Sequence, residues 1–102
     1  MVIVMGHAKL APGDINRLND AMRAQIEATR AEEGCEHYSF ARDVLDPDTL
    51  VISERWRDND AIAAHFKAPH MAAFNAALAT ATVLDVSVKA YDNGEVRTLM
   101  GK

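Results

Sequence analysis

The stretch Glu54-Arg55-Trp56-Arg57-Asp58, followed by His65 and by Pro69-His70, decides how the fold of this chain is interpreted. The apolar residues before it predict a strand that ends in an acidic residue and a large aromatic one. Asp58 then opens a short helix with His65 on its apolar side, and the proline starts another helix with His70 just inside. These titratable groups are therefore predicted at the seam between a sheet and its covering helices, where small-molecule sites often form.

The composition is typical of one globular domain. The chain has 102 residues, of which 49% are hydrophobic and 25% charged, enough for one core and too few for two. A formal net charge of −4, without any cluster of Lys and Arg, argues against nucleic-acid binding. No apolar run approaches the roughly 20 residues that span a bilayer, and residues 1–7 do not resemble a signal peptide. Because Cys35 is the only cysteine, we expect no intrachain disulfide and a cytoplasmic location.

The spacing of apolar residues predicts an α+β domain with an antiparallel sheet. Strands are expected over residues 2–10, 35–42, 49–56 and 82–91, and helices over residues 15–31, 59–66 and 69–79. The first strand is rich in Val, Ile and Met and is expected to be buried on both faces. Asp14 is placed to cap the first helix and Gly34 to end it. The order strand, helix, strand, strand, broken helix, strand is the split βαβ, or ferredoxin-like, arrangement.

One face of this sheet is left without a covering layer. Strands this apolar would expose a large hydrophobic surface there, which monomers rarely tolerate. We therefore expect a homodimer in which two sheets pack face to face. Residues 92–95 predict a turn, after which the apolar segment 96–100 could extend onto the sheet edge of the partner.

The motifs together resemble a known family. They comprise Gly34-x-x-x-Tyr38, the turn at Asp46-Pro47, Glu54-x-Trp56-x-Asp58, His65, Pro69-His70 and Phe74. This pattern, over essentially the whole chain, resembles the antibiotic biosynthesis monooxygenase superfamily of small dimeric α+β-barrel proteins. The resemblance implies the fold more strongly than the chemistry, because members diverge in activity on one scaffold.

The family contains several chemistries. Some members oxidise quinols or polyketide-derived aromatics without metal or flavin, others degrade haem, and one isomerises a phosphorylated signalling sugar. The haem branch needs a Trp on the short helix, an Asn on the first strand and an axial His on the next helix. This chain has His65, Gly6 and Asn75 at those places, which counts against haem degradation. Around His65 and Pro69-His70 the chain resembles the quinol-oxidising and isomerase branches better.

His65 is the candidate catalytic residue. Its place between helix and sheet would allow the imidazole, whose ordinary pKa is about 6.5, to accept a proton from a phenolic or enediol hydroxyl. The alternative is a partly buried histidine that is hydrogen-bonded to backbone. Strand parity leaves open whether His37 and Ser39, grouped with Cys35 on one face, line the same pocket or lie in the dimer interface.

The remaining candidates could either contact a substrate or serve the core. These substrate-binding candidates are Trp56, Phe66, His70, Met71 and Phe74. Glu54 shares a strand face with Trp56 and, if buried, needs a partner, so a structural role is favoured for it. Cys35 has no base beside it in sequence, which argues against a nucleophilic cysteine.

No metal-binding, phosphate-binding or dinucleotide-binding motif is present in the sequence, so we expect no cofactor. His65 and His70 are five residues apart across a proline, unlike the i, i+4 pair of a helical zinc site. The resemblance then implies a cofactor-independent monooxygenase that takes a small aromatic substrate and dioxygen. Two alternatives stay open: an isomerase of an enediol-type, possibly phosphorylated, metabolite, and a non-catalytic dimer that binds a small ligand.

Overall fold

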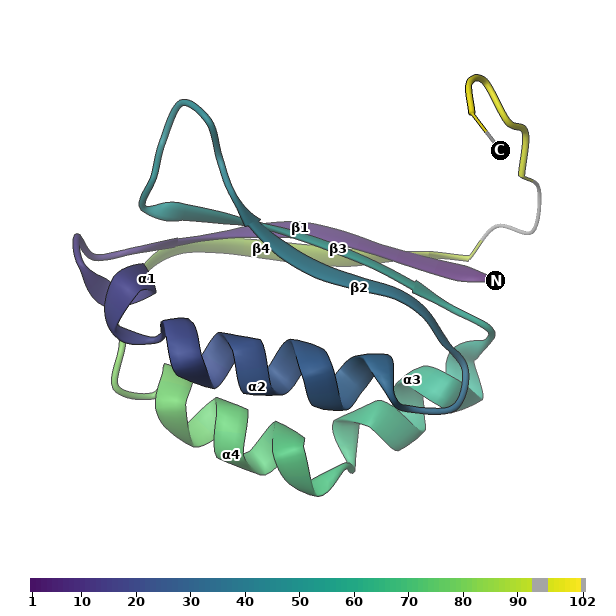
Figure 1. The fold of residues 1–102 in the computed structure, drawn as a ribbon, viewed down its shortest axis with the longest axis horizontal. Coiled ribbons are helices and arrows are strands. Elements are labelled where there is room, and N and C mark those ends of the chain that lie inside the picture. Colours follow the sequence, from purple (N-terminus) through teal and green to yellow (C-terminus); the bar gives the residue numbers. More distant parts are fainter. Residues whose placement is uncertain (93–95, 102) are drawn as a thin grey trace.

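The computed structural model describes residues 1–92 and 96–101, which form one antiparallel sheet with helices on one side (Figure 1). The elements in chain order are β1 (Val2–Leu10), α1 (Asp14–Arg17), α2 (Asn19–Arg30), β2 (Cys35–Arg42), β3 (Thr49–Trp56), α3 (Asn59–Phe66), α4 (Pro69–Leu78) and β4 (Val83–Asp92). The strand order is β2-β3-β1-β4, and every neighbouring pair is antiparallel. The predicted ferredoxin-like fold is confirmed. The turn predicted at residues 92–95 falls largely outside the described residues.

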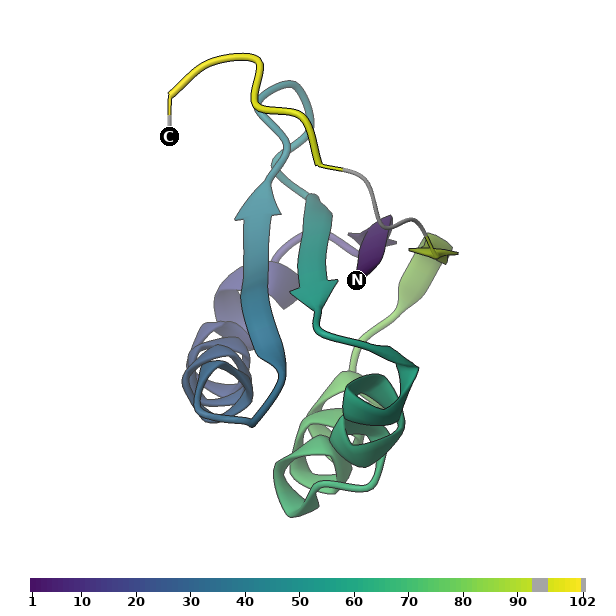
Figure 2. The same cartoon turned by 90° about the vertical axis from the view of Figure 1, so that its right-hand side faces the viewer.

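The first strand is buried on one face, not on both as predicted. Val2, Val4 and Leu10 point toward the helices and are buried, whereas Met5 points away and is exposed. Figure 2 shows the reason, because all helices lie on the same side of the sheet. The strand is apolar on both faces, but only one of them has a covering layer.

The first helix is divided and starts differently from the prediction. Gly13, with φ at +88°, precedes α1, and the chain leaves helical geometry at Leu18 before α2 begins. Asp14 is the first helical residue, not the cap. Its Oδ2 accepts the backbone N–H of Thr82 at 2.9 Å and so connects the helix start to the segment before β4.

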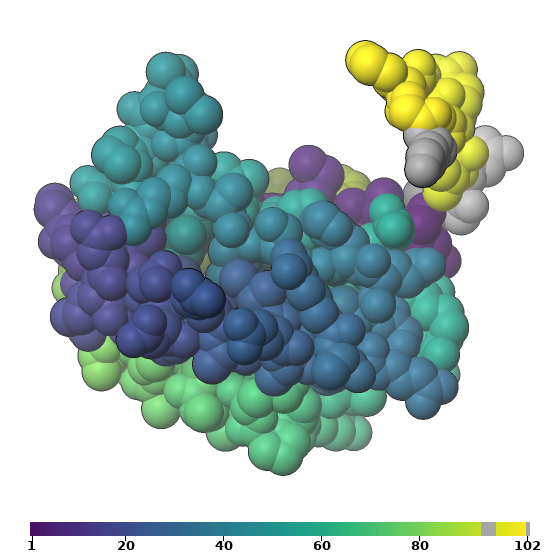
Figure 3. All heavy atoms as spheres, viewed as in Figure 1, coloured from purple at the N-terminus to yellow at the C-terminus, as the bar shows by residue number. Residues whose placement is uncertain are grey.

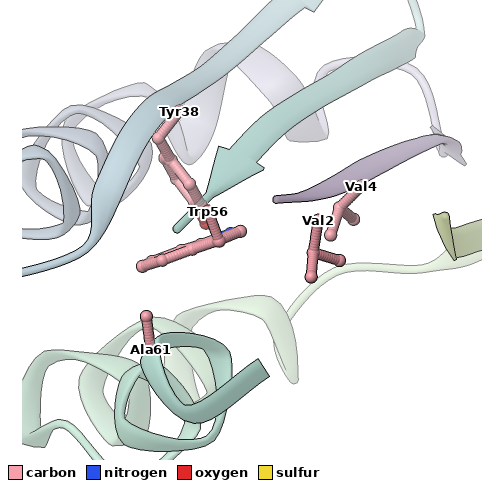
Figure 4. Close-up of a cluster of buried hydrophobic side chains, with 5 residues drawn as sticks. All are labelled: Val2, Val4, Tyr38, Trp56 and Ala61. Carbon is pink, nitrogen blue, oxygen red and sulfur yellow. The ribbon is translucent and has the colours of Figure 1, made fainter. Parts of the chain in front are cut away.

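Two apolar clusters fill the space between sheet and helices. The cluster nearer α3 consists of Val2, Val4, Tyr38, Trp56 and Ala61, and Figure 4 shows the Trp56 indole between the sheet and that helix. The other cluster consists of Leu10, Ile15, Leu18, Met22 and Leu50. The fully buried indole thus packs beneath α3, the helix that carries His65.

The edge strand β4 has an uncovered apolar face on the helix side of the sheet. Pairing with Ala8 and Gly6 turns Val86 and Val88 toward the helix layer, yet they are 57% and 47% exposed. A side chain at Gly6 would come within 2.8 Å of the Val88 Cα, so this close strand approach requires glycine. The helix layer leaves this part of the sheet open.

The opposite, open face of the sheet is less apolar than predicted. Met5 and Val51 are exposed on it, but His7 on the same face bonds Asp85 of β4 at 3.0 Å. The cause is the register of β4, which directs two of its valines toward the helices. Loop 43–48 and segment 96–101 stand away from the body in Figure 3, on the side of this open face. No helix within the described residues is long and apolar enough to cross a membrane.

Candidate functional site

The candidate site is centred on His65, which is only 3% exposed between α3 and the sheet. Asp58 caps α3 by accepting the Ala61 N–H at 2.8 Å, and His65 lies on the buried side of this helix. The imidazole centroid lies 4.8 Å from the Trp56 ring and 5.6 Å from the Tyr38 ring. A titratable imidazole is therefore held against an aromatic wall.

Glu32 supplies the polar partner of this imidazole. Its Oε2 lies 2.6 Å from Nδ1 of His65, a short charge-assisted contact. Glu32 sits in the turn between α2 and β2, which depends on Gly34 at φ +85°. The Gly34 carbonyl accepts the Arg57 N–H at 2.8 Å, so this turn is bound to the end of β3.

A second imidazole approaches the same carboxylate. Nε2 of His70 lies 3.4 Å from Oε2 of Glu32, and its Nδ1 lies 2.9 Å from Oε1 of Gln25. The amide nitrogen of Gln25 donates to the Tyr38 hydroxyl at 3.3 Å and to the Met71 sulfur at 2.9 Å. Because the Gln25 nitrogen already donates to these two groups, its oxygen accepts from Nδ1–H of His70. One buried amide thus joins β2 and α4 to the site.

Burial changes the acidity of the groups around His65. It raises the pKa of Tyr38 to about 12, against the lowering effect of the bond from Gln25. Burial also raises the pKa of Glu54, while the bond from Trp56 Nε1 at 2.8 Å and a charged His65 oppose that rise. The Tyr38 hydroxyl therefore stays protonated and uncharged at physiological pH.

Three donor groups come close enough together to be considered as metal ligands. The ligand atoms of Glu32, His65 and His70 all lie within 4.8 Å of one another. Two ligands of a tetrahedral zinc at about 2.1 Å from the metal are separated by about 3.4 Å. The 2.6 Å contact between Glu32 and His65 is much shorter and matches a hydrogen bond. In the observed arrangement Glu32 is hydrogen-bonded to His65, and His70 approaches the same carboxylate at 3.4 Å.

Four of the substrate-binding candidates lie close to His65 or its network. Trp56 packs against the imidazole, His70 approaches Glu32, and Met71 contacts Gln25. Phe74 stacks on Phe40 at 5.8 Å in the neighbouring part of the core. The Trp56 side chain is fully buried, and its indole packs against the imidazole.

The other three candidates are placed differently. His37 and Ser39 lie on the open face of the sheet, away from the helices and from His65. An irregularity between Cys35 and His37 turns Cys35 to the helix side, so the predicted common face of all three residues is wrong. Phe66 is near His65, with centroids 5.7 Å apart, but is 67% exposed on the surface of α3.

Sequence reasoning missed Glu32 and Gln25. Gln25 left a usable signal, because it falls on the apolar stripe of α2 between Met22 and Thr29, and a buried amide needs partners. Glu32 left none, since it lies in a polar turn that resembles any solvated helix end. The role of Glu32 follows only from the contact with α3, 33 residues further along the chain.

A family comparison identifies the chain. The sequence profile described as antibiotic biosynthesis monooxygenase matches residues 1–77. The chain belongs to the antibiotic biosynthesis monooxygenase family. The match covers β1 through most of α4, and so includes His65, Glu32 and all of the network around them.

Individual relatives are similar to this family member over most of its length. The "Probable quinol monooxygenase YgiN" of Escherichia coli K12 is 26% identical over 92% of this chain and 99% of its own length. The "Uncharacterized protein sll1783" of Synechocystis is 28% identical, over 96% of this chain and 67% of its own length. A crystal structure from Deinococcus radiodurans, provisionally named an antibiotic biosynthesis monooxygenase, superposes with a TM-score of 0.89 at 30% identity. That match covers 99% of this chain and 100% of the other.

Proposed function

We propose that this family member is a cofactor-independent monooxygenase that oxidises a quinol or a similar polyphenol with dioxygen. The observation that carries the proposal is the buried His65 imidazole, which is bonded to a carboxylate and surrounded by aromatic rings. Such an imidazole can accept a proton from a phenolic hydroxyl in surroundings that contain little water. The name of the Escherichia coli relative, a probable quinol monooxygenase, supports the same substrate class.

In the proposed reaction, His65 takes a proton from one hydroxyl of the hydroquinone. The electron-rich anion passes one electron to dioxygen, and the two radicals combine to form a carbon–oxygen bond. The oxygen–oxygen bond of this peroxide then breaks, and one oxygen atom leaves as water. Hydroquinone and dioxygen thus give a hydroxylated quinone and water. The protein contributes the base, a low-polarity environment and confinement of the radicals.

The uncovered strip on the helix side of β4 is a suitable place for the substrate ring. Val86 and Val88 present an exposed apolar surface there, and Gly6 leaves it flat. Glu54 pairs with Val4 of β1, on the same side of the sheet, and a charged His65 lowers its pKa. A planar aromatic ring on the strip would bring its hydroxyl toward the base.

A homodimer is also part of the proposal. The open face of the sheet exposes Met5 and Val51. Loop 43–48 and segment 96–101, on the same side, expose Val44, Leu45, Leu99 and Met100. A second copy packed on this face would cover these side chains. The dimeric architecture implied by the family supports this arrangement.

Oxygen uptake tests the activity. The native protein and His65→Ala are compared on a small panel of reduced naphthoquinols and polyphenols, and autoxidation without protein is subtracted. We expect native uptake above background and a decrease on the order of 100-fold in His65→Ala, the usual contribution of a general base. Native uptake no faster than background across the panel would refute the monooxygenase and favour an isomerase or a ligand-binding dimer.

A further inference from the structure

The second imidazole nitrogen, Nε2, is the atom of His65 that could face a substrate, and the position of Glu32 controls it. A neutral imidazole carries one proton, and whichever nitrogen holds it can no longer accept another. The Glu32 carboxylate lies 2.6 Å from Nδ1 and can only accept a hydrogen bond there. The proton of neutral His65 is therefore held on Nδ1, and Nε2 keeps its lone pair.

We infer that Glu32 is the positioning residue of His65, which selects the tautomer that can act as a base and stabilises the imidazolium formed by proton transfer. This inference rests on the proposed function, because it assigns Glu32 a role in that same site. When His65 accepts the substrate proton at Nε2, the ring becomes positive beside a carboxylate. The attraction between the ring and the Glu32 carboxylate is stronger after the transfer than before it. An interaction that strengthens as the proton moves lowers the barrier and raises the rate.

Other charged or titratable groups face the imidazole, but none of them matches this role. Tyr38 on β2 contacts it with its ring, and its hydroxyl is bonded to Gln25. Glu54 on β3 is bonded to the indole of Trp56. His70 on α4 lies 5.8 Å away between centroids and approaches the far side of the cluster through Glu32. Among the described residues, Glu32 makes the direct contact.

The position of Glu32 is itself defined by the structure. Its side chain is 18% exposed, and Nε2 of His70 lies 3.4 Å from the same oxygen that contacts His65. His70 is held in turn by Gln25, a residue that is 2% exposed. The Glu32 carboxylate is thus partly buried and bonded to His65, whereas the neighbouring Glu33 is exposed and pairs with Arg57.

The test separates the charge of Glu32 from its role as an acceptor. Glu32→Gln keeps an acceptor oxygen without the charge, Glu32→Leu removes both, and Glu33→Gln is the matched control. Nitrogen-15 NMR of the histidine rings reports which nitrogen of His65 is protonated, with His65→Ala used to assign the signals. Oxygen uptake on the same quinol panel gives kcat and KM for each variant.

We expect native neutral His65 to carry its proton on Nδ1 and Glu32→Leu to shift it toward Nε2. In Glu32→Leu, kcat should fall about 10- to 100-fold with little change in KM, as expected for the loss of one charge-assisted bond. Glu32→Gln should keep the tautomer but lose part of the rate, and Glu33→Gln should match the native protein. Thermal melts confirm that each variant is folded.

Two results would overturn the inference: a native His65 protonated on Nε2, or a Glu32→Leu variant with native tautomer and native kcat. The NMR measurement needs no turnover. A native protein without oxygen uptake but with the Glu32-dependent tautomer would therefore refute the proposed reaction and leave the tautomer control by Glu32 standing.

Discussion

At the scale of single residues, burial raises the pKa of two polar side chains beside His65. Burial raises the pKa of Glu54, whose carboxylate is bonded to Trp56, and it raises the pKa of Tyr38 to about 12. Neither group resembles a free proton acceptor at neutral pH. The base in the proposed reaction is therefore His65, whose Nδ1 contacts Glu32.

Glu54→Gln should raise the free energy of unfolding above that of the native chain. This gain should be larger at pH 7 than at pH 4. Burial raises the pKa of Glu54, so its ionisation costs more in the folded state than in the unfolded state. That cost appears as the pH rises through the folded pKa, and the uncharged amide removes it while still accepting the Trp56 N–H. Urea titrations of both proteins at each pH check this. An advantage that is larger at pH 4 would contradict it.

Tyr38→Phe should lower the free energy of unfolding by about 1 kcal/mol, because Gln25 loses one acceptor inside the core. The shape of the pH dependence of oxygen uptake between pH 6 and about 9 should stay unchanged, since a hydroxyl with a pKa of about 12 does not titrate there. A new inflection in the variant's profile would show that the hydroxyl takes part in proton transfer. Denaturant titration and rate measurements give the two results.

At the scale of elements, the turn between α2 and β2 positions Glu32 against α3. Gly34 combines φ at +85° with close packing, because a Cβ there would lie 2.6 Å from the Cβ of Ala61. Gly13 also has positive φ but no atom within 4 Å of such a Cβ. Both substitutions would carry a cost of backbone strain, but only one at Gly34 would add steric overlap. Comparing them therefore distinguishes the two costs.

Gly34→Ala should cost about 1 to 3 kcal/mol more stability than Gly13→Ala, because it adds overlap to a similar backbone penalty. Combining Gly34→Ala with Ala61→Gly should recover part of the loss, since the overlapping methyl group is removed. Denaturant titrations of the three variants and the double mutant measure these effects. Equal costs for the two glycine substitutions, or fully additive effects in the double mutant, would argue against the overlap.

At the scale of the whole molecule, the helices cover only part of the sheet and the other face is open (Figure 2). The open face combines polar groups with Met5 and Val51. Loop 43–48 and segment 96–101, on the same side, carry exposed apolar side chains. Such a surface is typical of an interface between copies of a chain more than of a free protein surface.

Light scattering should therefore find a dimer at micromolar concentration. Met5→Glu places a charge at the centre of the open face and should shift the protein toward monomer. Ala76→Glu, on an exposed position of α4, is the control and should leave the dimer intact. A native monomer, or equal dimerisation of all three proteins, would refute the face-to-face arrangement.

The sequence by itself determined the element order, nearly all element ends, the fold class and the inward position of His65. These features depend on local periodicity, on caps such as Asp58 and on glycines such as Gly34, which act over a few residues of chain. Family resemblance also came from short motifs of this kind. All of this information is present before the chain folds.

Tertiary structure alone decided the rest. The irregularity beside Cys35 separated that residue from His37 and Ser39, which the β2–β3 register places on the open face, and the register of β4 turned its valines toward the helices. A shift of one residue exchanges the two faces of a strand, and apolar content does not reveal it. Glu32 meets His65 only because the α2–β2 turn and α3 pack together across 33 residues of sequence. Register and long-range packing are properties of the folded chain, and here they complete the site.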